Sequence, residues 1–339
     1  MMLLFLFKII RLMILQKFSK YFLILAGSLG VSGVLYQNIS AAIDNYQFPP
    51  PGKMVDVGGY RLHIQGSGSA TPTVILDAGL AMNSMDWALV QPEIARFARV
   101  YSYDRPGLGW SELSPYPRDS LTMAKELHAL LHAFHLEPPF ILVGHSSGGA
   151  NVLMYAFLYP DEVSGLVLVD SVHEKQSELL PPDEPIPWNE RLTCFSDPYL
   201  GRLTGTFGIS RFFLKYSQLQ KDLDQLPPSI KKPYFAKLSS PEFFRTAYAE
   251  DVHFDESLKQ LARMKKAVHI PIIVITAGPQ INEDDPTIDP ADKTWSRFQQ
   301  EICDLSDKSI HLFAENSDHM IPWHQPEIIV EAVKLLSQP

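Results

Sequence analysis

Short runs of consecutive apolar residues recur along the chain and alternate with longer stretches whose apolar residues have helical spacing. The runs lie at 73–77, 99–103, 140–143, 165–169, 271–276 and 309–313. Between them lie amphipathic stretches such as 120–135, in which the apolar residues share one helical face. Continuous apolar strands separated by helices are typical of a mostly parallel sheet that is covered on both faces. The pattern therefore predicts an α/β fold.

Two segments depart from this alternation. Residues 55–64 predict a β-hairpin around Gly58-Gly59, ahead of the first buried strand. Residues 174–262 are rich in proline, charge and aromatic side chains and contain no buried-strand run. We expect this stretch to be a helical cap inserted over the strand ends, where α/β sheets bind their ligands. The predicted core then consists of 54–173 and 263–339.

The N-terminal part of the chain is a different kind of sequence. Residues 1–20 form a basic, apolar leader, and residues 21–43 are 23 consecutive uncharged positions. As a helix the second segment spans about 34 Å, enough to cross a bilayer core of about 30 Å. The four basic residues of this region all precede it, which predicts that the N-terminus stays in the cytoplasm. We therefore expect a single-pass transmembrane anchor, with the rest of the chain outside the cytoplasm.

A cleaved signal peptide is the competing interpretation of the same segment. Ser40 and Ala42 are small residues that are suitably spaced before a cleavage point. The long leader and the polar stretch after Tyr36 favour an uncleaved anchor instead. Residues 44–53 contain three consecutive prolines, which end any helix and form a short, stiff spacer before the folded part.

The composition of the chain excludes only a few classes of protein. The chain of 339 residues is 46% hydrophobic and 20% charged, as in an ordinary globular protein. A net charge of −9, without a basic patch that is interleaved with aromatic residues, argues against a nucleic-acid partner. The two cysteines, Cys194 and Cys303, have no metal-ligand or C-x-x-C spacing. They are either two free, half-buried thiols, which is the simpler interpretation, or one disulfide.

The candidate chemistry lies in residues 140–149, which read Phe-Ile-Leu-Val-Gly-His-Ser-Ser-Gly-Gly. An apolar run ends in the pattern G-x-S-x-G, formed by Gly144, Ser146 and Gly148, and a helix-like stretch follows over 150–159. A strand, a tight turn and a helix with serine at the apex form a nucleophile elbow. The apex residue is held in a strained conformation, and only small neighbours let the strand and helix approach so closely. Ser146 is therefore the candidate nucleophile.

The chain resembles the α/β-hydrolase superfamily over residues 54–337. The resemblance rests on an oxyanion turn, a loop similar to D-R-x-G-x-G-x-S, the elbow and a histidine loop, in the family's order. These segments are Leu76 to Leu80, followed by Trp87; Tyr103 to Ser111; 140–149; and Asn316 to Ile321. The resemblance implies an α/β-hydrolase fold, with a mostly parallel sheet flanked by helices and an inserted helical cap. One departure is Asp77, which replaces the common histidine of the oxyanion turn and changes its support.

A serine hydroxyl needs a base to take its proton and a carboxylate to orient that base. In the family the histidine comes last in the chain, and only His319 follows a late strand and precedes the last helix. The resemblance thus implies His319 as the general base. We expect His324 to be a surface residue and His145 to serve packing or hydrogen bonding. Three histidines have spacing compatible with metal binding but lack the H-E-x-x-H pattern, which favours a solvated helix edge: His128, His132 and His135.

The position of the catalytic acid is open. Superfamily members usually carry it a few residues after the strand predicted at 271–276, where the next carboxylates here are Glu283, Asp284 and Asp285. Some relatives carry it at the end of the strand after the elbow helix, where Asp170 stands. We favour Asp170, with Asp285 and Asp284 as alternatives; an Asp170 without a catalytic role would only cap its strand end. Two further aspartates are expected to stabilise their loops: Asp104 and Asp318.

The resemblance also implies an oxyanion hole made by the backbone amides of Leu80 and Ser147. Two such donors matter, because removing one typically costs about 3 kcal/mol of transition-state stabilisation. A serine at the apex argues against dehalogenase or epoxide-hydrolase chemistry, for which relatives use aspartate. No metal, nucleotide or flavin motif is present in the sequence, so we expect no cofactor.

Together these features predict a membrane-anchored serine hydrolase, a carboxylic-ester hydrolase that acts on a small or lipid-derived ester. An aminopeptidase or amidase of the same fold is one alternative. It would need an anchor for the amine of its substrate, such as Glu250 or Asp251 in the cap. A catalytically silent member that binds a ligand or partner under its cap is the other alternative, supported only by the missing acid at the usual place.

Overall fold

Eight strands form a single sheet in the computed structural model, which describes residues 2–180, 198–214, 223–282 and 284–338. The strand order is β1-β2-β4-β3-β5-β6-β7-β8. The pairs β1–β2 and β2–β4 are antiparallel and the remaining pairs are parallel, which confirms the predicted fold class. The strands are β1 (Lys53–Asp56), β2 (Arg61–Ser67), β3 (Thr73–Asp77), β4 (Arg99–Tyr103), β5 (Phe140–His145), β6 (Val163–Val169), β7 (Ile272–Ala277) and β8 (Ser309–Ala314).

The predicted apolar runs correspond to strands β3 to β8. The run at 140–143 continues to His145, and the run at 165–169 already begins at Val163. β3 and β5 are buried along their whole length because helices cover both faces of the sheet. The hairpin of β1 and β2 turns at Gly58 and Gly59, whose φ angles of 112° and 103° lie in a region that glycine adopts readily.

Helices on the two faces of the sheet bury two separate apolar clusters. Successive residues of a strand point to opposite faces, so Ile75 of β3 belongs to one cluster and Val74 to the other. The first cluster includes side chains of α3 (Ser120–Ala133), α4 (Ser147–Leu158), α12 (Phe254–Met264) and α13 (Pro290–Cys303). The second includes side chains of η1 (Ser84–Trp87), α2 (Gln91–Ile94), α14 (Ile321–His324) and α15 (Pro326–Leu336). A short turn, η2 (Pro160–Glu162), joins α4 to β6.

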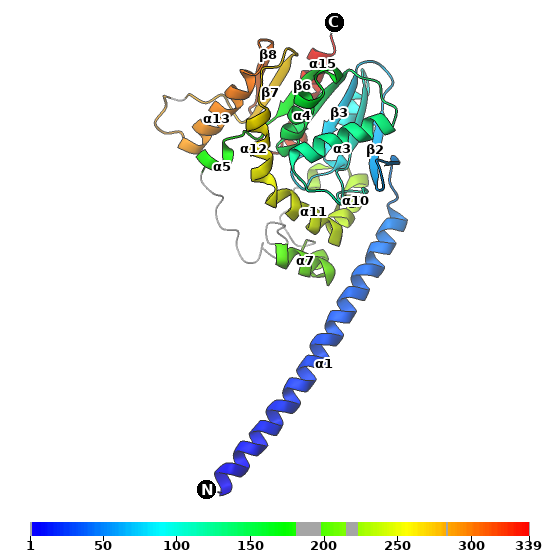
Figure 1. Cartoon of the computed structure of the whole chain (residues 1–339), viewed down its shortest axis with the longest axis vertical. Coiled ribbons are helices and arrows are strands. Elements are labelled where there is room, and N and C mark those ends of the chain that lie inside the picture. Colours follow the sequence, from blue (N-terminus) through cyan, green and yellow to red (C-terminus); the bar gives the residue numbers. More distant parts are fainter. Residues whose placement is uncertain (1, 181–197, 215–222, 283, 339) are drawn as a thin grey trace.

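The insert between β6 and β7 is helical in the parts that the structure describes, as predicted for the cap. Its helices α7, α10 and α11 lie together at one end of the sheet (Figure 1). Cap side chains such as Leu214 and Phe244 share a third apolar cluster with core residues such as Met85. Trp188 and Phe195, part of the predicted cap, lie outside the described residues. The cap elements are α5 (Gln176–Leu179), α7 (Pro198–Thr206), α8 (Ile209–Leu214), η3 (Leu223–Gln225), α10 (Pro228–Leu238) and α11 (Pro241–Val252), followed by α12.

α1 (Met2–Gln47) is one long helix that projects away from the sheet (Figure 1). The predicted spacer at 44–53 is therefore too long, because the helix continues into it and ends just before the prolines. The polar stretch does not interrupt the helix because its side chains bind the cap: Gln37 donates to the Ser239 carbonyl, and Asp44 pairs with Arg211. Residues Met13–Gln47 are long and apolar enough to cross a membrane and lie exposed, which fits either an anchor or a signal sequence.

Candidate active site

Ser146 stands at the sharp turn between β5 and α4. Its φ of 53° and ψ of −121° form a conformation that a residue other than glycine adopts only where the surrounding structure holds it. The turn needs glycine on both sides. A Cβ on Gly144 would lie 2.4 Å from the Gly148 carbonyl oxygen, and a Cβ on Gly148 would lie 2.4 Å from the Asp77 carbonyl oxygen. The G-x-S-x-G spacing therefore lets β5, α4 and the end of β3 meet around the serine.

Asp170 follows β6, and its carboxylate contacts His319 in the loop after β8. The distance between Asp170 Oδ2 and His319 Nδ1 is 2.7 Å. The other oxygen, Oδ1, accepts hydrogen bonds from the Trp295 indole at 2.9 Å and from the Ala277 backbone amide at 3.1 Å. Burial raises the pKa of Asp170, but the hydrogen bond and charge of His319, with the two other donors, bring the pKa below its usual value. An ionised carboxylate accepts the Nδ1 proton, which leaves Nε2 of the imidazole as a proton acceptor.

Ser146 and His319 line the same pocket, which has a volume of about 480 Å³. Most of its other walls are apolar and come from the cap and from core loops: Leu80, Met82, Leu214, Leu238, Phe243, Met320 and Trp323. Among the described residues no hydrogen bond joins the Ser146 hydroxyl to His319. Such bonds often tighten only in the complex with substrate. The pocket thus combines a nucleophile, a base and an apolar surface.

The two amides predicted for the oxyanion hole both lie next to Ser146. The turn that carries Leu80 packs on the elbow so closely that a Cβ on Gly79 would be 3.4 Å from the Ser146 Cβ. Ser147 is the first residue of α4, where backbone amides have no acceptor within the helix. Amides in these two places can donate to an oxygen that is bound at the serine.

A buried arginine holds the turn of Leu80 in place. Arg105 Nη1 donates to the Asp77 carboxylate at 2.7 Å and to the Ala78 carbonyl at 2.6 Å. Its Nη2 donates to the Gly79 carbonyl at 2.6 Å. The aspartate that stands in place of the common histidine therefore supplies the countercharge for a guanidinium that binds three consecutive residues of the turn.

Glu250 of α11 completes this network from the cap. Its Oε1 accepts from Arg105 Nε at 2.7 Å, and its Oε2 accepts from the Ala81 backbone amide at 2.8 Å. Glu250 is only 4% exposed, so its carboxylate is already used and does not reach a substrate amine, the role considered for it above. This pair was not predicted from the sequence. The sequence did hold a signal for part of the network: Asp77 at the end of an apolar strand, together with Arg105 in the D-R loop. A buried carboxylate requires a cation, so these two residues could have been expected to pair.

We expect Glu250→Ala to destabilise the fold by about 3–5 kcal/mol, because it leaves the Arg105 guanidinium buried with only one of its two carboxylates. Urea unfolding followed by circular dichroism measures this loss. Glu256→Ala is the matched control: its ion pair with Arg263 is exposed, and such pairs contribute about 1 kcal/mol or less. Equal effects of the two variants would show that the Arg105 network does not support the fold.

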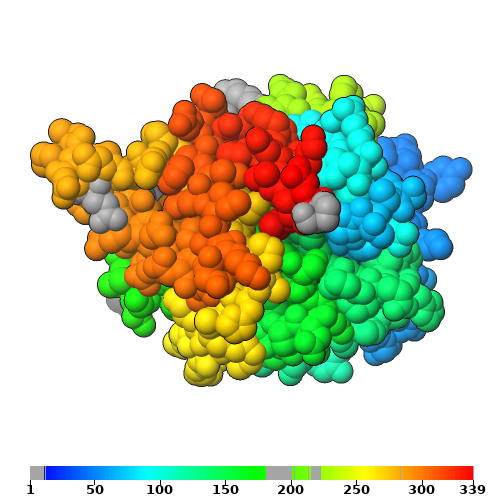
Figure 2. Space-filling view, turned by 90° about the horizontal axis from the view of Figure 1, so that it is seen from above, coloured from blue at the N-terminus to red at the C-terminus, as the bar shows by residue number. Residues whose placement is uncertain are grey.

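The alternative acids lie away from this site. Asp284 and Asp285 are in the loop after β7, which forms the golden lobe at the left of Figure 2. Asp285 is bound within its own turn by the Thr287 amide and hydroxyl. The structure therefore brings Asp170 to His319 and leaves Asp284 and Asp285 outside the pocket.

The other two aspartates of the sequence analysis stabilise loops, as expected. Asp104 is buried and accepts hydrogen bonds from the Ser84 and Trp110 amides. Asp318 accepts from the Met320 amide and also pairs with His324 Nδ1 at 2.7 Å. His324 is partly exposed, which agrees with the expected surface position, and it also lines the pocket and contacts Gln225 of the cap at 2.9 Å.

His145, inside the elbow, serves hydrogen bonding rather than proton transfer. It is buried, and its Nε2 donates to the His319 carbonyl at 2.8 Å. Burial, together with the neighbouring His319, lowers the pKa of His145 to about 3, so the ring stays neutral. It thus ties the loop of the candidate base to the elbow.

In the part of the chain that the structure describes, two groups of side chains outside the pocket could hold a metal ion, with ligand atoms within 4.8 Å of one another. They are His128, His132 and Glu162, and His173, Glu174 and Glu301. His128 and His132 both contact Glu162 and are partly exposed on α3, which agrees with the expected helix edge. Cys303 is free and fully buried rather than half-buried, while Cys194 lies outside the described residues.

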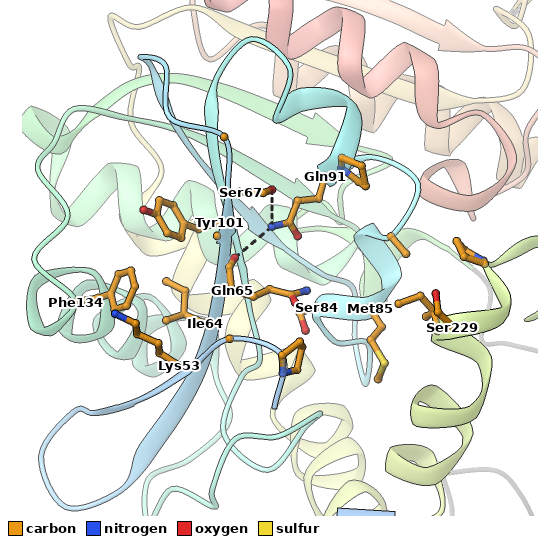
Figure 3. Close-up of a pocket in the computed structure, with 18 residues that line it drawn as sticks. Lys53, Ile64, Gln65, Ser67, Ser84, Met85, Gln91, Tyr101, Phe134 and Ser229 are labelled. Atoms are coloured by element: carbon orange, nitrogen blue, oxygen red, sulfur yellow. Dashed lines mark hydrogen bonds between the residues drawn. The ribbon is translucent and has the colours of Figure 1, made fainter. Parts of the chain in front are cut away.

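A larger cleft of about 790 Å³ lies on another part of the molecule, between β2, η1 and the start of α10 (Figure 3). Its polar side chains are partly bound to one another, since Gln91 donates to the Gln65 carbonyl at 3.2 Å. None of the residues that line it is Ser146, His319 or Asp170. We therefore place the candidate reaction in the smaller pocket.

Comparison with known proteins identifies the family. The model of the Alpha/beta hydrolase family matches residues 74–332. The uncharacterized protein YqjL of Bacillus subtilis is 25% identical over 286 residues, which cover 83% of this chain and 90% of that protein. The 2-hydroxymuconate semialdehyde hydrolase of Pseudomonas sp. strain CF600 is 32% identical over 128 residues, which cover 36% of this chain and 44% of that enzyme.

Solved structures share the fold. Cfl2 from Burkholderia cenocepacia superimposes with a TM-score of 0.64 at 23% identity, covering 84% of this chain and 95% of that one. A thermophilic esterase from Thermogutta terrifontis superimposes with a TM-score of 0.58 at 18% identity, covering 84% and 99%. At such identities the likeness shows the fold and leaves the substrate open.

Proposed function

Because this chain belongs to the alpha/beta hydrolase family, we propose that it is a serine hydrolase that cleaves carboxylic esters through an acyl-enzyme on Ser146. The observation that carries the proposal is the 2.7 Å contact between Asp170 and His319, whose imidazole shares a pocket with the elbow serine. A carboxylate, an imidazole and a hydroxyl in this order can deprotonate the serine and stabilise the imidazolium that results.

The reaction then follows from the positions of these groups. His319 Nε2 takes the Ser146 proton while the hydroxyl oxygen attacks the ester carbonyl. The charge that develops on the carbonyl oxygen is stabilised by the amides of Leu80 and Ser147. His319 returns the proton to the leaving alcohol, which departs and leaves the acyl group on Ser146. A water molecule, deprotonated by His319, attacks the acyl-enzyme, and the acid leaves with Ser146 restored.

The apolar walls of the pocket favour an ester with an apolar acyl group. A volume of about 480 Å³ is in the range of sites for small ligands, and among the described residues that line it there is no Lys or Arg that would bind an anionic acyl group. Of the two cap carboxylates considered as an amine anchor, Glu250 is bound to Arg105, which weakens the case for an aminopeptidase.

We further propose that α1 remains attached as an anchor, with its N-terminus in the cytoplasm and the domain outside. The basic residues before Tyr21 support this orientation. Contacts between α1 and the cap support retention of the helix, because cleavage near Ile43 would remove Gln37 and its hydrogen bond to the Ser239 carbonyl.

A substrate panel tests the proposed reaction. Purified full-length protein in detergent is assayed with p-nitrophenyl esters of increasing acyl length and with amino-acid p-nitroanilides. We expect hydrolysis of the esters, faster for apolar acyl chains than for acetate, and far slower hydrolysis of the anilides. Preferential cleavage of the anilides would contradict the esterase assignment.

A further inference from the structure

The tip of the cap is packed against the apolar part of α1. Phe207, between α7 and α8, lies against two glycines of α1: a Cβ on Gly33 would be 2.7 Å from the Phe207 carbonyl oxygen, and a Cβ on Gly30 would be 3.4 Å from its ring. On the next residue of the cap, a Cβ on Gly208 would be 2.8 Å from the Tyr36 ring. The small residues on both sides therefore allow a close contact between the helix and the cap.

This contact lies well inside the uncharged segment. After Lys20 the first charged residue is Asp44, and Gly33 precedes it by eleven residues. Eleven helical residues correspond to about 16 Å along the axis of α1. If the uncharged segment crosses a bilayer core of about 30 Å and Asp44 marks the outer edge of that core, the cap tip at Phe207 lies close to the middle of the bilayer, at the inner limit of the outer leaflet. Figure 1 shows α7 beside α1, on the side of the domain from which the helix projects.

The side chains of the cap tip suit a lipid environment. Leu203 of α7 is 53% exposed, and on α8 Ile209 is 40% and Phe212 is 60% exposed. Residues 198–214 contain no acidic residue, and the charge of Arg211 is paired with Asp44. Exposed apolar side chains on short helices that are continuous with a membrane helix can be buried at the membrane interface.

α8 connects this surface to the pocket. Near its start, Gly208 contacts α1 at Tyr36, and further along Arg211 pairs with Asp44 at 2.6 Å, so the helix ascends alongside α1. It ends at Leu214, which is buried and lines the pocket that contains Ser146. α8 therefore carries the exposed side chains of Ile209 and Phe212 and ends at the wall of the pocket that contains Ser146.

We propose that α7 and α8 form a membrane-embedded surface of the cap, and that the substrates are esters of long acyl chains that enter the pocket from the outer leaflet of the bilayer. This inference rests on the proposed esterase function for its substrate class, but not for the insertion of the cap. The partner that binds this surface is, in this proposal, the lipid bilayer. The crosslinking experiment below distinguishes the bilayer from a second protein that would cover the same surface.

Kinetics with two substrates test the access of lipid-borne esters. The full-length protein is reconstituted in phosphatidylcholine vesicles and assayed with monooleoylglycerol in the bilayer and with water-soluble p-nitrophenyl butyrate. In the double variant Leu203→Glu and Ile209→Glu, we expect at least about a tenfold loss of monooleoylglycerol hydrolysis, because buried charges are costly in the bilayer, and no loss with the butyrate. Leu179→Glu, at an exposed cap leucine on α5, is the matched control and should change neither rate. Equal rates in the double variant and the wild type, or equal losses with both substrates, would overturn the proposal.

Crosslinking tests the insertion without any activity. Leu203→benzoylphenylalanine, illuminated in the same vesicles, should give a phosphatidylcholine adduct by mass spectrometry, and Leu179→benzoylphenylalanine should give none. If the protein forms the lipid adduct but hydrolyses no ester, the proposal of a membrane surface stands and the proposed esterase function is rejected. The absence of a lipid adduct at position 203, or an adduct only to another protein, would reject the membrane surface itself.

Discussion

Ser146→Ala should lower kcat by about 10⁶-fold, the loss measured when a serine protease loses its nucleophile. No other described side chain in the pocket is expected to replace the hydroxyl in forming the acyl-enzyme. The two amides of the oxyanion hole stabilise the carbonyl oxygen only while a nucleophile attacks the carbonyl carbon. The fold should persist, since the side chain is small and no described residue donates to or accepts from its hydroxyl. Hydrolysis of p-nitrophenyl butyrate by the detergent-solubilised protein measures the effect.

Ser147→Ala is the matched control for this variant. Its hydroxyl has no proposed part in the reaction, and its backbone amide remains in the alanine variant, so activity should stay close to that of the wild type. A fluorophosphonate probe should label Ser146 in the wild type and in Ser147→Ala. If the probe instead labels another serine in active protein, the elbow is not the site of the nucleophile.

Asp170→Asn should lower kcat by about 10⁴-fold, the scale seen for the same change in a serine protease. The Trp295 indole and the Ala277 amide both donate to Oδ1, so the asparagine oxygen will take that place. Its NH₂ group then faces His319 Nδ1, which must accept a hydrogen bond, and the ring proton moves to Nε2. In that tautomer His319 cannot take the serine proton, and the imidazolium has no countercharge.

Asp285→Asn tests the alternative position of the acid with the same chemistry. Its carboxylate is exposed and binds only within its own turn, so the change should have little effect on kcat. Circular dichroism of both variants separates a loss of activity from a loss of fold. An inactive Asp285→Asn together with an active Asp170→Asn would move the acid to the loop after β7.

The sheet could be predicted from the sequence because buried parallel strands require continuous apolar runs, and six such runs recur after residue 72 with turn residues and helical stretches between them. The elbow could be predicted equally well, because the observed turn leaves no room for a Cβ at Gly144 or Gly148 and therefore requires the glycines of the motif. The candidate acid was harder to choose. Chain order allowed two strand ends, and only the arrangement in space shows that the end of β6 faces the loop of His319 while the loop after β7 points away.

Contacts between distant segments escaped prediction for a physical reason. The partner of Arg105 is Glu250, 145 residues later in a cap helix whose sequence pattern carries no sign of the contact. The length of α1 was underestimated because the basic leader and the polar residues from Asp44 onward look like the flanks of a membrane helix rather than parts of it. At its C-terminal end the helix continues because Gln37 and Asp44 find partners in the cap.

The Arg105–Glu250 network has a consequence for how the enzyme can open. Glu250 on α11 binds the Ala81 amide and also binds Arg105, which holds Asp77, Ala78 and Gly79. If α11 swung outward as a lid, Glu250 would leave the Ala81 amide and Arg105. The guanidinium would then keep only Asp77 as a carboxylate partner, and the Glu250 carboxylate would lose its ion pair. If the Leu80 amide acts as proposed, the oxyanion hole stays assembled only while α11 remains packed on the turn. We expect substrate and product to exchange through the mouth of the pocket rather than by displacement of the whole cap.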